Sequence, residues 1–333
     1  MRTTTLGNSG PPVSALGLGC MGMSPGIYGP SDDAESLATI QAAVDAGITL
    51  IDTGDFYGMG HNEMLIRRAL EGVPRSKVVI SVKFGAMRDP AGGWGGNDCR
   101  PQAVKNFLAY TLRRLGVDYI DVYRPARLDP NTPIEDTIGA VADMVRAGYV
   151  RHIGLSEVGS ETIRCAHKVH PIADLQIEYS LMSRGIEASI LPTARSLGIA
   201  ITAYGVLSRG LLSGRVPSSD TKGDIRVIRM PRFKDGNLQK NLGLVGTLAQ
   251  IGREKGATTA QLAVAWVLSR GANIIPVVGA RRRDQLNETL GSLDIKLDAK
   301  DIARIEAAVS PELTAGARYD TLQMTHLDSE AHT

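Results

Sequence analysis

Short apolar runs alternate with longer amphipathic segments along most of the chain. The runs are rich in β-branched residues, and the segments between them space their apolar residues as an α-helix does. Eight runs predict strands at residues 13–19, 49–52, 78–83, 119–124, 151–156, 174–180, 200–205 and 274–279. Eight strand–helix repeats predict an α/β protein with a single-domain (β/α)8 TIM barrel of parallel strands.

An open, doubly wound sheet is the alternative fold. It would need fewer strands, and no G-x-G-x-x-G motif follows the first predicted strand. Three segments fall outside the repeat: the glycine-rich residues 89–98, residues 208–238, and the tail at 311–333. Long loops in compact folds usually carry function. We therefore expect one domain over residues 1–333, with long loops at the C-terminal face and the tail over the active site.

The segment DDAESLATIQAAVDAG, residues 32–47, predicts the first helix. Asp32 and Glu35 have the spacing of a capping box, in which each residue bonds the backbone of the other. Gly47 suits the turn that follows the last helical residue. The other predicted helices follow the same apolar period in the intervals between the later strands.

Composition narrows the class of protein. The chain has 333 residues, 43% of them apolar, and a formal net charge of +2 with acids and bases interspersed. Neither nucleic acid nor a membrane is an expected partner, since there is no basic stretch and no apolar span of about 20 residues. Three cysteines stand far apart in the sequence, which is typical of a reduced cytoplasmic protein without a metal site. Whether the chain is a monomer or a homo-oligomer stays open.

The ends of the predicted strands carry candidate chemistry, because barrel enzymes place their active sites there. Strand two is followed by Asp52 and Tyr57, and strand three ends at Lys83. A lysine ammonium lowers the pKa of a nearby tyrosine, and an aspartate keeps that ammonium charged. Tyr57 could then protonate a carbonyl oxygen while a nicotinamide delivers hydride. The alternative is an ordinary salt bridge beside a packed tyrosine.

Three arginines, Arg281 to Arg283, follow the last predicted strand and open a helix. Guanidinium groups match the geometry of a phosphate, and the positive end of a helix adds to the attraction. This pattern favours a phosphate site. A solvated basic turn is the alternative.

Several motifs together resemble those of the aldo-keto reductase family. They are IDTGDFYG at 51–58, VVISVKFG at 78–85, RRLGVDYIDVY at 113–123, VRHIGLSEV at 150–158, ITAYGVLSRGLLSG at 201–214 and IIPVVGARRRDQLNETL at 274–290. The similarity runs in order from about residue 3 to 320 and is greatest to bacterial reductases with the opening LGLGCMGMS. The resemblance implies a barrel that binds NADPH without a Rossmann domain and reduces aldehydes or ketones.

Carried over position by position, Asp52, Tyr57 and Lys83 match three of the four catalytic residues of the family, and Ala126 stands where the fourth, a histidine, is usual. The resemblance also implies a set of cofactor-binding residues: Gly22, Met23, Asp52, Ser156, Glu157, Gln176, Tyr204, Gly205, Leu207, Arg209, Gly210, Gly279, Arg281, Gln285 and Glu288. Glu157 replaces a common asparagine. Tyr57, Trp94 and Ala126 are the expected substrate pocket.

The alanine at position 126 allows two interpretations: an open pocket that tolerates bulky ketones, or a space that another group refills. Arg124 lies two residues earlier, so strand alternation places it on the same face, and we include it among the candidate catalytic residues. The alternative for Arg124 is an arginine inside the barrel, paired with a carboxylate. Among the histidines, only His326 and His332 in the tail could reach the site.

The predicted function is an NADPH-dependent oxidoreductase that reduces aldehydes or ketones to alcohols by hydride transfer. Tyr57 would be the general acid, assisted by Lys83 and Asp52, and the partner a small carbonyl compound. The alternative is a nicotinamide-binding regulatory or interaction subunit with weak residual reductase activity. A pure binding protein has no need of both Tyr57 and Lys83, so we favour the enzyme.

Overall fold

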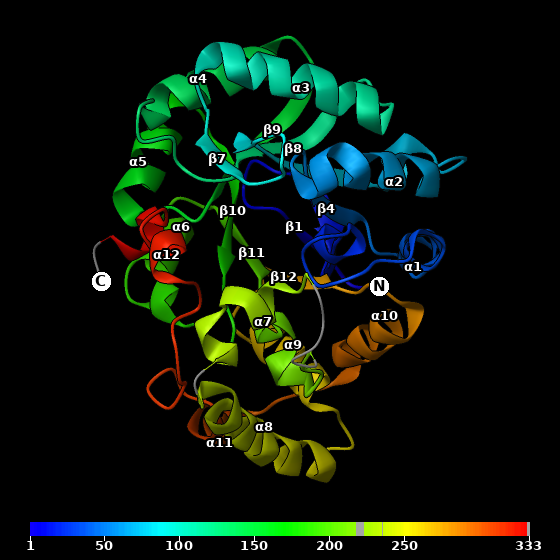
Figure 1. The fold of residues 1–333 in the computed structure, drawn as a ribbon, viewed down its shortest axis with the longest axis vertical. Helices are drawn as coiled ribbons and strands as arrows, with labels where there is room; N and C mark the ends of the chain where they lie inside the picture. Colours follow the sequence, from blue (N-terminus) through cyan, green and yellow to red (C-terminus); the bar gives the residue numbers. More distant parts are fainter. Residues whose placement is uncertain (218–222, 235, 332–333) are drawn as a thin grey trace.

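Eight parallel strands close into a barrel in the computed structural model, which describes residues 1–217, 223–234 and 236–331. In order around the barrel they are β3 (Gly17–Gly19), β4 (Leu50–Gly54), β5 (Val79–Phe84), β8 (Ile120–Pro125), β9 (Val150–Ser156), β10 (Ile172–Glu178), β11 (Ala200–Tyr204) and β12 (Ile274–Gly279). Strand β12 pairs with β3 and completes the closure. The predicted TIM barrel is confirmed (Figure 1).

A helix follows each barrel strand and packs outside it. These helices are α1 (Asp33–Asp45), α2 (His61–Ala69), α3 (Pro101–Leu115), α4 (Ile134–Arg146), α5 (Ser160–Val169), α6 (Ile190–Ser196), α9 (Thr259–Ser269) and α10 (Arg283–Leu290). Consecutive helices from α1 to α6 contact one another, and α10 contacts α1. Figure 1 shows the resulting ring of helices around the strands. The ring covers the outer face of the sheet, so the strands are buried on both faces.

The predicted strand at residues 13–19 is two elements. β1 (Thr3–Thr5) and β2 (Pro12–Ser14) form an antiparallel hairpin, and β3 enters the barrel only at Gly17. The hairpin contributes Leu6 and Val13 to an apolar cluster inside the barrel that also contains Leu50, Val79, Val122, Ala200, Ile275 and Val277. The first part of the predicted strand therefore belongs to the hairpin, whose apolar side chains pack inside the barrel. Only the last residues, from Gly17, form a barrel strand.

Among the described residues, further α-helices and a second hairpin lie beside the strand–helix repeat. The glycine-rich segment contributes to the hairpin of β6 (Ala86–Arg88) and β7 (Trp94–Asn97). Helices α7 (Ile225–Arg229) and α8 (Asn237–Glu254) lie between β11 and α9, while α11 (Ala299–Ala308) and α12 (Thr321–Met324) follow α10. Part of the long loop predicted at 208–238, residues 218–222 and 235, lies outside the described residues.

The capping box predicted for the first helix is only half formed. Asp32 accepts a hydrogen bond from the Glu35 backbone N–H at 3.1 Å. The Glu35 carboxylate does not bond back, because Arg283 of α10 holds it at 2.9 Å. Gly47 adopts a φ of 87°, as expected of the residue that ends such a helix.

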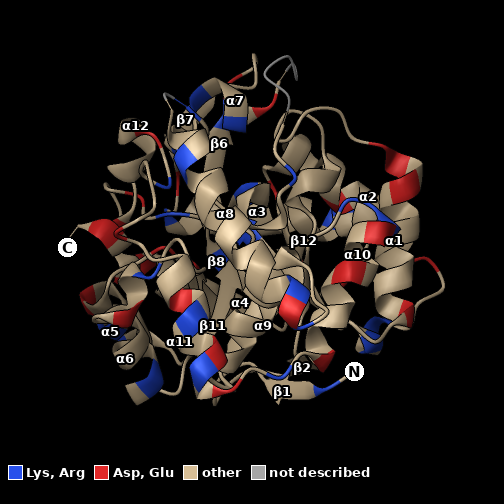
Figure 2. Cartoon of the chain, turned by 90° about the horizontal axis from the view of Figure 1, so that it is seen from below, with Lys and Arg blue, Asp and Glu red and all other residues tan. Residues whose placement is uncertain are grey.

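Figure 2 shows both acidic and basic residues distributed over the helices, in keeping with a net charge of +2. A single large apolar core fills the space between the sheet and the helix ring.

Within the described ranges, no helix combines the length and apolarity needed to cross a lipid bilayer.

Candidate active site

A cavity of about 890 Å³ opens at the C-terminal ends of the barrel strands. Most of the residues that the sequence assigns to the site line it: Gly22, Asp52, Tyr57, Lys83, Trp94, Ala126, Ser156, Gln176, Tyr204, Gly205, Leu207, Arg209, Gly210, Gly279, Arg281, Gln285 and Glu288. Met23, Arg124 and Glu157 do not line it. The volume lies near the upper end of the roughly 300–1,000 Å³ common for ligand pockets.

Asp52 and Lys83 form a buried ion pair in the cavity wall. The Lys83 Nζ lies 2.6 Å from Asp52 Oδ2, and both residues are about 95% buried. The other carboxylate oxygen of Asp52 accepts hydrogen bonds from Ser81 at 3.0 Å and from Gln176 at 2.8 Å. The parallel pairing of β4 and β5 places these groups side by side, with Asp52 opposite Ser81 and residue 54 opposite Lys83. The lysine ammonium is therefore fixed in position by a fully bonded carboxylate.

Tyr57 lies beside this pair. It is 6% exposed, and Lys83 Nζ lies 5.2 Å from the centroid of its ring. Burial and the negative charge of Asp52 raise the pKa of Tyr57 well above its usual value, and Arg127 opposes that shift. Burial lowers the pKa of Lys83, although Asp52 opposes the effect. The phenol therefore keeps its proton at neutral pH in this cavity.

Arg124 lies inside the barrel, below the cavity. It is fully buried, and its Nη2 donates to Asp174 of β10 at 3.0 Å. Its Nη1 is 3.9 Å from Asp52 Oδ1, and neither Nη1 nor Nε has a hydrogen-bond partner among the described residues. Burial raises the pKa of Asp174 even though Arg124 opposes the shift. Arg124 is therefore the interior arginine that the sequence analysis gave as the alternative. An arginine inside the barrel and one that reaches the cavity lie on the same face of the strand, so the sequence pattern could not distinguish them.

Ala126 lines the cavity directly after β8 and is 2% exposed. The next residue, Arg127, also lines the cavity, and its Nη1 donates to the Ala126 carbonyl at 2.6 Å. The same Nη1 lies 3.5 Å from the Ser156 hydroxyl. Arg127 is a site residue that the sequence analysis missed. Its place immediately after a strand end is the signal that could have identified it.

Glu157 is held away from the cavity by a network of buried bonds. Its carboxylate accepts from Arg318 at 3.0 and 2.6 Å and from the Tyr204 hydroxyl at 2.6 Å. Burial alone would raise the pKa of Glu157, but Arg318 lowers it below the usual range. Glu157 thus lies outside the lining of the large cavity, and its contact with a cofactor stays a prediction. Met23 is likewise absent from the wall, because it is fully buried in the apolar core.

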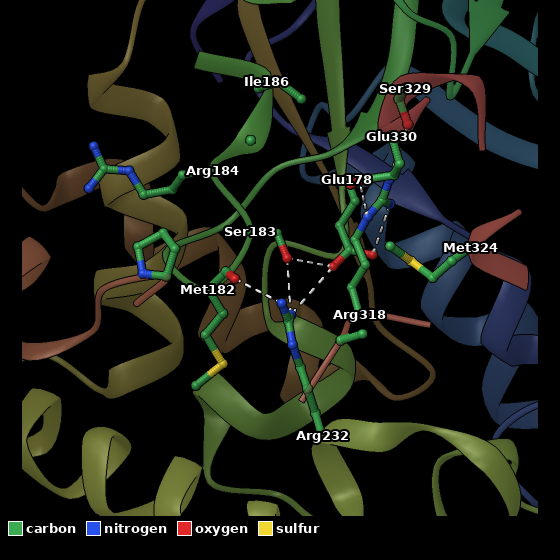
Figure 3. A pocket seen from close by; sticks show the side chains of 13 residues that line it. Glu178, Met182, Ser183, Arg184, Ile186, Arg232, Arg318, Met324, Ser329 and Glu330 are labelled. Atoms are coloured by element: carbon green, nitrogen blue, oxygen red, sulfur yellow. Dashed lines mark hydrogen bonds and ion pairs between the residues drawn. The ribbon is translucent and has the colours of Figure 1, made fainter. Parts of the chain in front are cut away.

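A second, smaller cavity of about 270 Å³ lies behind this network. Figure 3 shows Arg232 and Arg318 converging on Glu178. Arg232 also donates to the Ser183 hydroxyl at 3.0 Å and to the Met182 carbonyl at 2.8 Å. Both guanidinium groups are bonded within the protein, and the bonds of Arg318 connect the tail to the barrel.

The side of the large cavity next to α10 is basic. Arg281 donates to the carbonyls of Tyr28 and Pro30 at 3.0 and 3.3 Å. Burial and the neighbouring charge of Arg226 lower the pKa of Arg281, which indicates several cations close together. Arg282 also lines this side, whereas Arg283 points away from it toward Glu35. The predicted triple of arginines thus divides into two cavity residues and one residue on the outer surface.

The tail forms part of the cavity wall. Tyr319, Leu322, Gln323, His326 and Leu327 line it, and the Tyr319 hydroxyl lies 2.9 Å from that of Tyr204. Trp94 of β7 is 42% exposed and packs near His326, with ring centroids 6.2 Å apart. The other tail histidine, His332, lies outside the described residues. Loop and tail together therefore border the space above Tyr57.

The fold and the position of the cavity define a (β/α)8-barrel protein whose site lies at the carboxyl ends of its strands. The profile of the aldo/keto reductase family matches residues 15–310. The soybean protein "Probable aldo-keto reductase 1" (Glycine max) is 39% identical over 323 residues, covering 96% of this chain and 92% of the relative. The chain belongs to the aldo/keto reductase family and is an oxidoreductase of carbonyl compounds.

Solved structures agree with this assignment. The glycerol dehydrogenase of Gluconobacter oxydans superposes with a TM-score of 0.82 at 30% identity, covering 92% of this chain and 96% of that one. An aldo-keto reductase of Bacillus halodurans in its holo form gives 0.76 at 25% identity, covering 93% and 97% of the two chains.

Proposed function

We propose that the protein reduces aldehydes or ketones to alcohols with NADPH, and that Tyr57 is the general acid. The observation that carries the proposal is the buried Lys83–Asp52 pair beside Tyr57 in the wall of the large cavity. A buried ion pair contributes little to stability compared with apolar packing, so its presence at a cavity favours a functional role.

The residues of the cavity fit a nicotinamide dinucleotide. Ser156 and Gln176 offer a hydroxyl and an amide that would hold the nicotinamide carboxamide, and Tyr204 offers a ring beside them. Arg281 and Arg282 would hold the 2′-phosphate of NADPH, since charge-assisted bonds to a phosphate are strong. Gly22 leaves room at this side, where a Cβ would lie 3.3 Å from the Arg281 side chain. The concentration of cations there favours NADPH over NADH.

When bound, NADPH supplies a hydride to the carbonyl carbon. The Tyr57 hydroxyl supplies the proton to the carbonyl oxygen, and its raised pKa keeps that proton in place until the oxygen becomes basic. The Lys83 ammonium then stabilises the phenolate that remains, and Asp52 keeps the ammonium oriented. Solvent returns a proton to the phenolate and completes the cycle.

We do not assign a catalytic role to Arg124, which the sequence analysis included among the candidates. It is fully buried, bonds Asp174 and is absent from the cavity wall, so it has no path to a substrate. Its charge contributes to the environment of Lys83, whose pKa it helps to lower. A location in the cytoplasm, and the choice between monomer and homo-oligomer, stay predictions.

The experiment that tests the proposal follows the absorbance of reduced nicotinamide with a panel of aldehydes and ketones. We expect wild-type protein to consume NADPH with several of them, and Lys83→Met to lose most of that turnover while still binding NADPH. A nicotinamide-binding regulatory subunit would bind NADPH and show no substrate-dependent consumption. That result would overturn the proposal.

A further inference from the structure

Arg127 is a cation in the cavity wall without a carboxylate of its own. Several arginines of the cavity pair with acids, as Arg209 does with Glu178 at 3.0 Å and Arg226 with Asp224 at 2.6 Å. The Arg281 guanidinium, by contrast, bonds only backbone carbonyls among the described residues, on the side of the cavity next to α10. Across residues 1–217, 223–234 and 236–331, no carboxylate lies within 4.0 Å of the Arg127 guanidinium. Its recorded hydrogen bonds use only Nη1, so Nε and Nη2 remain as donors. A half-buried guanidinium in this state is suited to a negative charge that arrives with a ligand.

The position of this guanidinium is fixed by two contacts. The bond to the Ala126 carbonyl folds it back over position 126, and the 3.5 Å contact with Ser156 brings it toward β9. Ala126 and Arg127 line the same cavity, and the alanine side chain takes little of its volume.

Arg127 is also electrostatically close to the proposed acid. Of the cations that act on Tyr57, Arg127 lowers its pKa most, ahead of any effect of Lys83. The two side chains also line the same cavity. Arg127 thus lies within 3.5 Å of the Ser156 hydroxyl, which we propose for the nicotinamide, and borders the cavity that Tyr57, which we propose for the substrate, also lines.

We propose that Arg127 donates a hydrogen bond to the carbonyl oxygen of the substrate beside Tyr57, and so supplies the donor that Ala126 lacks. This inference rests on the proposed function. As hydride adds to the carbonyl carbon, the C=O π electrons move to oxygen, and Tyr57 transfers its proton there. NADPH is oxidised to NADP⁺ and the carbonyl is reduced to an alcohol, while Arg127 makes and breaks no covalent bond. It stabilises the negative charge that develops on oxygen.

A guanidinium differs from an imidazole in one measurable way. It does not titrate near neutral pH, whereas an imidazole does so near pH 6.5. We therefore expect no step in kcat between about pH 6 and 8 that comes from this donor.

The test compares Arg127→Met, Arg127→Lys and the control Arg146→Met, which removes an exposed charge from α4. Loss of a preorganised oxyanion donor lowers kcat by about 10²–10³-fold, and we expect that loss for Arg127→Met with unchanged NADPH binding. Removing the cation should also raise the pKa of Tyr57, so the alkaline limb of the kcat profile moves to higher pH. Arg127→Lys keeps the positive charge. It should therefore retain more activity than Arg127→Met, and its alkaline limb should move less. Arg146→Met should match wild type in every measurement.

A double variant that moves the hydrogen-bond donor from residue 127 to residue 126 separates loss of the donor from a folding defect. The double variant Ala126→His with Arg127→Met returns a donor to the site, and we expect it to turn over faster than Arg127→Met alone. Near-normal kcat and an unmoved pH limb in Arg127→Met would overturn the inference while Tyr57→Phe still abolishes turnover. Absence of turnover in wild type with every carbonyl would instead overturn the proposed function.

Discussion

Arg318 donates to both carboxylate oxygens of Glu157, at 3.0 and 2.6 Å, across 161 residues of sequence. The bonds join the C-terminal tail to the end of β9, and both side chains are more than 90% buried. Tyr204, which we assign to the nicotinamide site, bonds the same carboxylate. The tail is thereby part of the barrel's buried structure, and the tyrosine ring is held by the same network that holds the tail.

Breaking this pair should destabilise the protein. Arg318→Met leaves the Glu157 charge buried without its main partner, which typically costs about 3–5 kcal/mol. Urea unfolding should show this loss, and adding Glu157→Gln to Arg318→Met should recover part of it. Because the pKa of Glu157 is lowered in the folded state, its contribution is present above its unfolded pKa and fades as the pH falls below it. The difference between wild type and Glu157→Gln should therefore shrink in acid.

Cofactor preference should depend on Arg281 and not on Arg283. Arg281→Ala should weaken NADPH binding by about 10–100-fold, from the loss of a charge-assisted bond of roughly 1.5–3 kcal/mol, and change NADH binding little. Arg283→Ala is the matched control, since Arg283 pairs with Glu35 outside the cavity. Titrations by nicotinamide fluorescence measure both. Equal losses for NADPH and NADH in Arg281→Ala would contradict the phosphate assignment.

Position 126 should control the size of the substrate. Ala126→His fills space in the cavity wall beside Arg127, so we expect KM to rise for bulky ketones while small aldehydes keep or gain rate. Steady-state kinetics over a graded series of ketones tests this. A substrate profile identical to wild type would mean that residue 126 does not face the substrate.

Asp55 should make stability depend on pH in the direction opposite to Glu157. Burial, followed by the charge of Glu63, raises the pKa of Asp55 to about 8, and its Oδ2 has no hydrogen-bond partner among the described residues. The protonated form is favoured on folding, so this contribution is complete below the unfolded pKa near 3.9 and is lost as the pH rises through about 8. Asp55→Asn should be more stable than wild type at pH 9, by at most about 6 kcal/mol, and similar at pH 4. An equal difference at both pH values would exclude ionisation of Asp55 as the cause.

The barrel could be predicted from the sequence because the pattern of an apolar strand followed by an amphipathic helix recurs eight times. Each of the eight apolar runs encodes a strand buried on both faces, and the helices between them carry a clear 3.6-residue period. The hairpin at 3–14 was not predicted because its two strands are three residues each and β1 consists of threonines, so neither has an apolar pattern of its own. Register within a short run depends on tertiary packing inside the barrel, and a local pattern does not contain that information.

The site residues that could be predicted from the sequence are those whose positions follow from the C-terminal ends of the strands. Asp52 and Lys83 follow directly from their places on β4 and β5. The fate of Arg124 depended on Asp174, a partner fifty residues later that only the closed barrel brings within reach. The pairing of Glu157 with Arg318 depended on the path of the tail, which has no periodic signal. Ion pairs between residues far apart in the sequence, Arg124 with Asp174 and Glu157 with Arg318, therefore hold these two candidate side chains outside the cavity lining.

Single-turnover oxidation of bound NADPH by a reactive aldehyde, in wild type and in Tyr57→Phe, tests the central claim most directly. The phenylalanine ring keeps the packing beside Lys83 and removes only the proton donor. The account predicts rapid oxidation in wild type and nearly none in Tyr57→Phe, with equal NADPH binding by both proteins. Oxidation at a similar rate in the two proteins would contradict it.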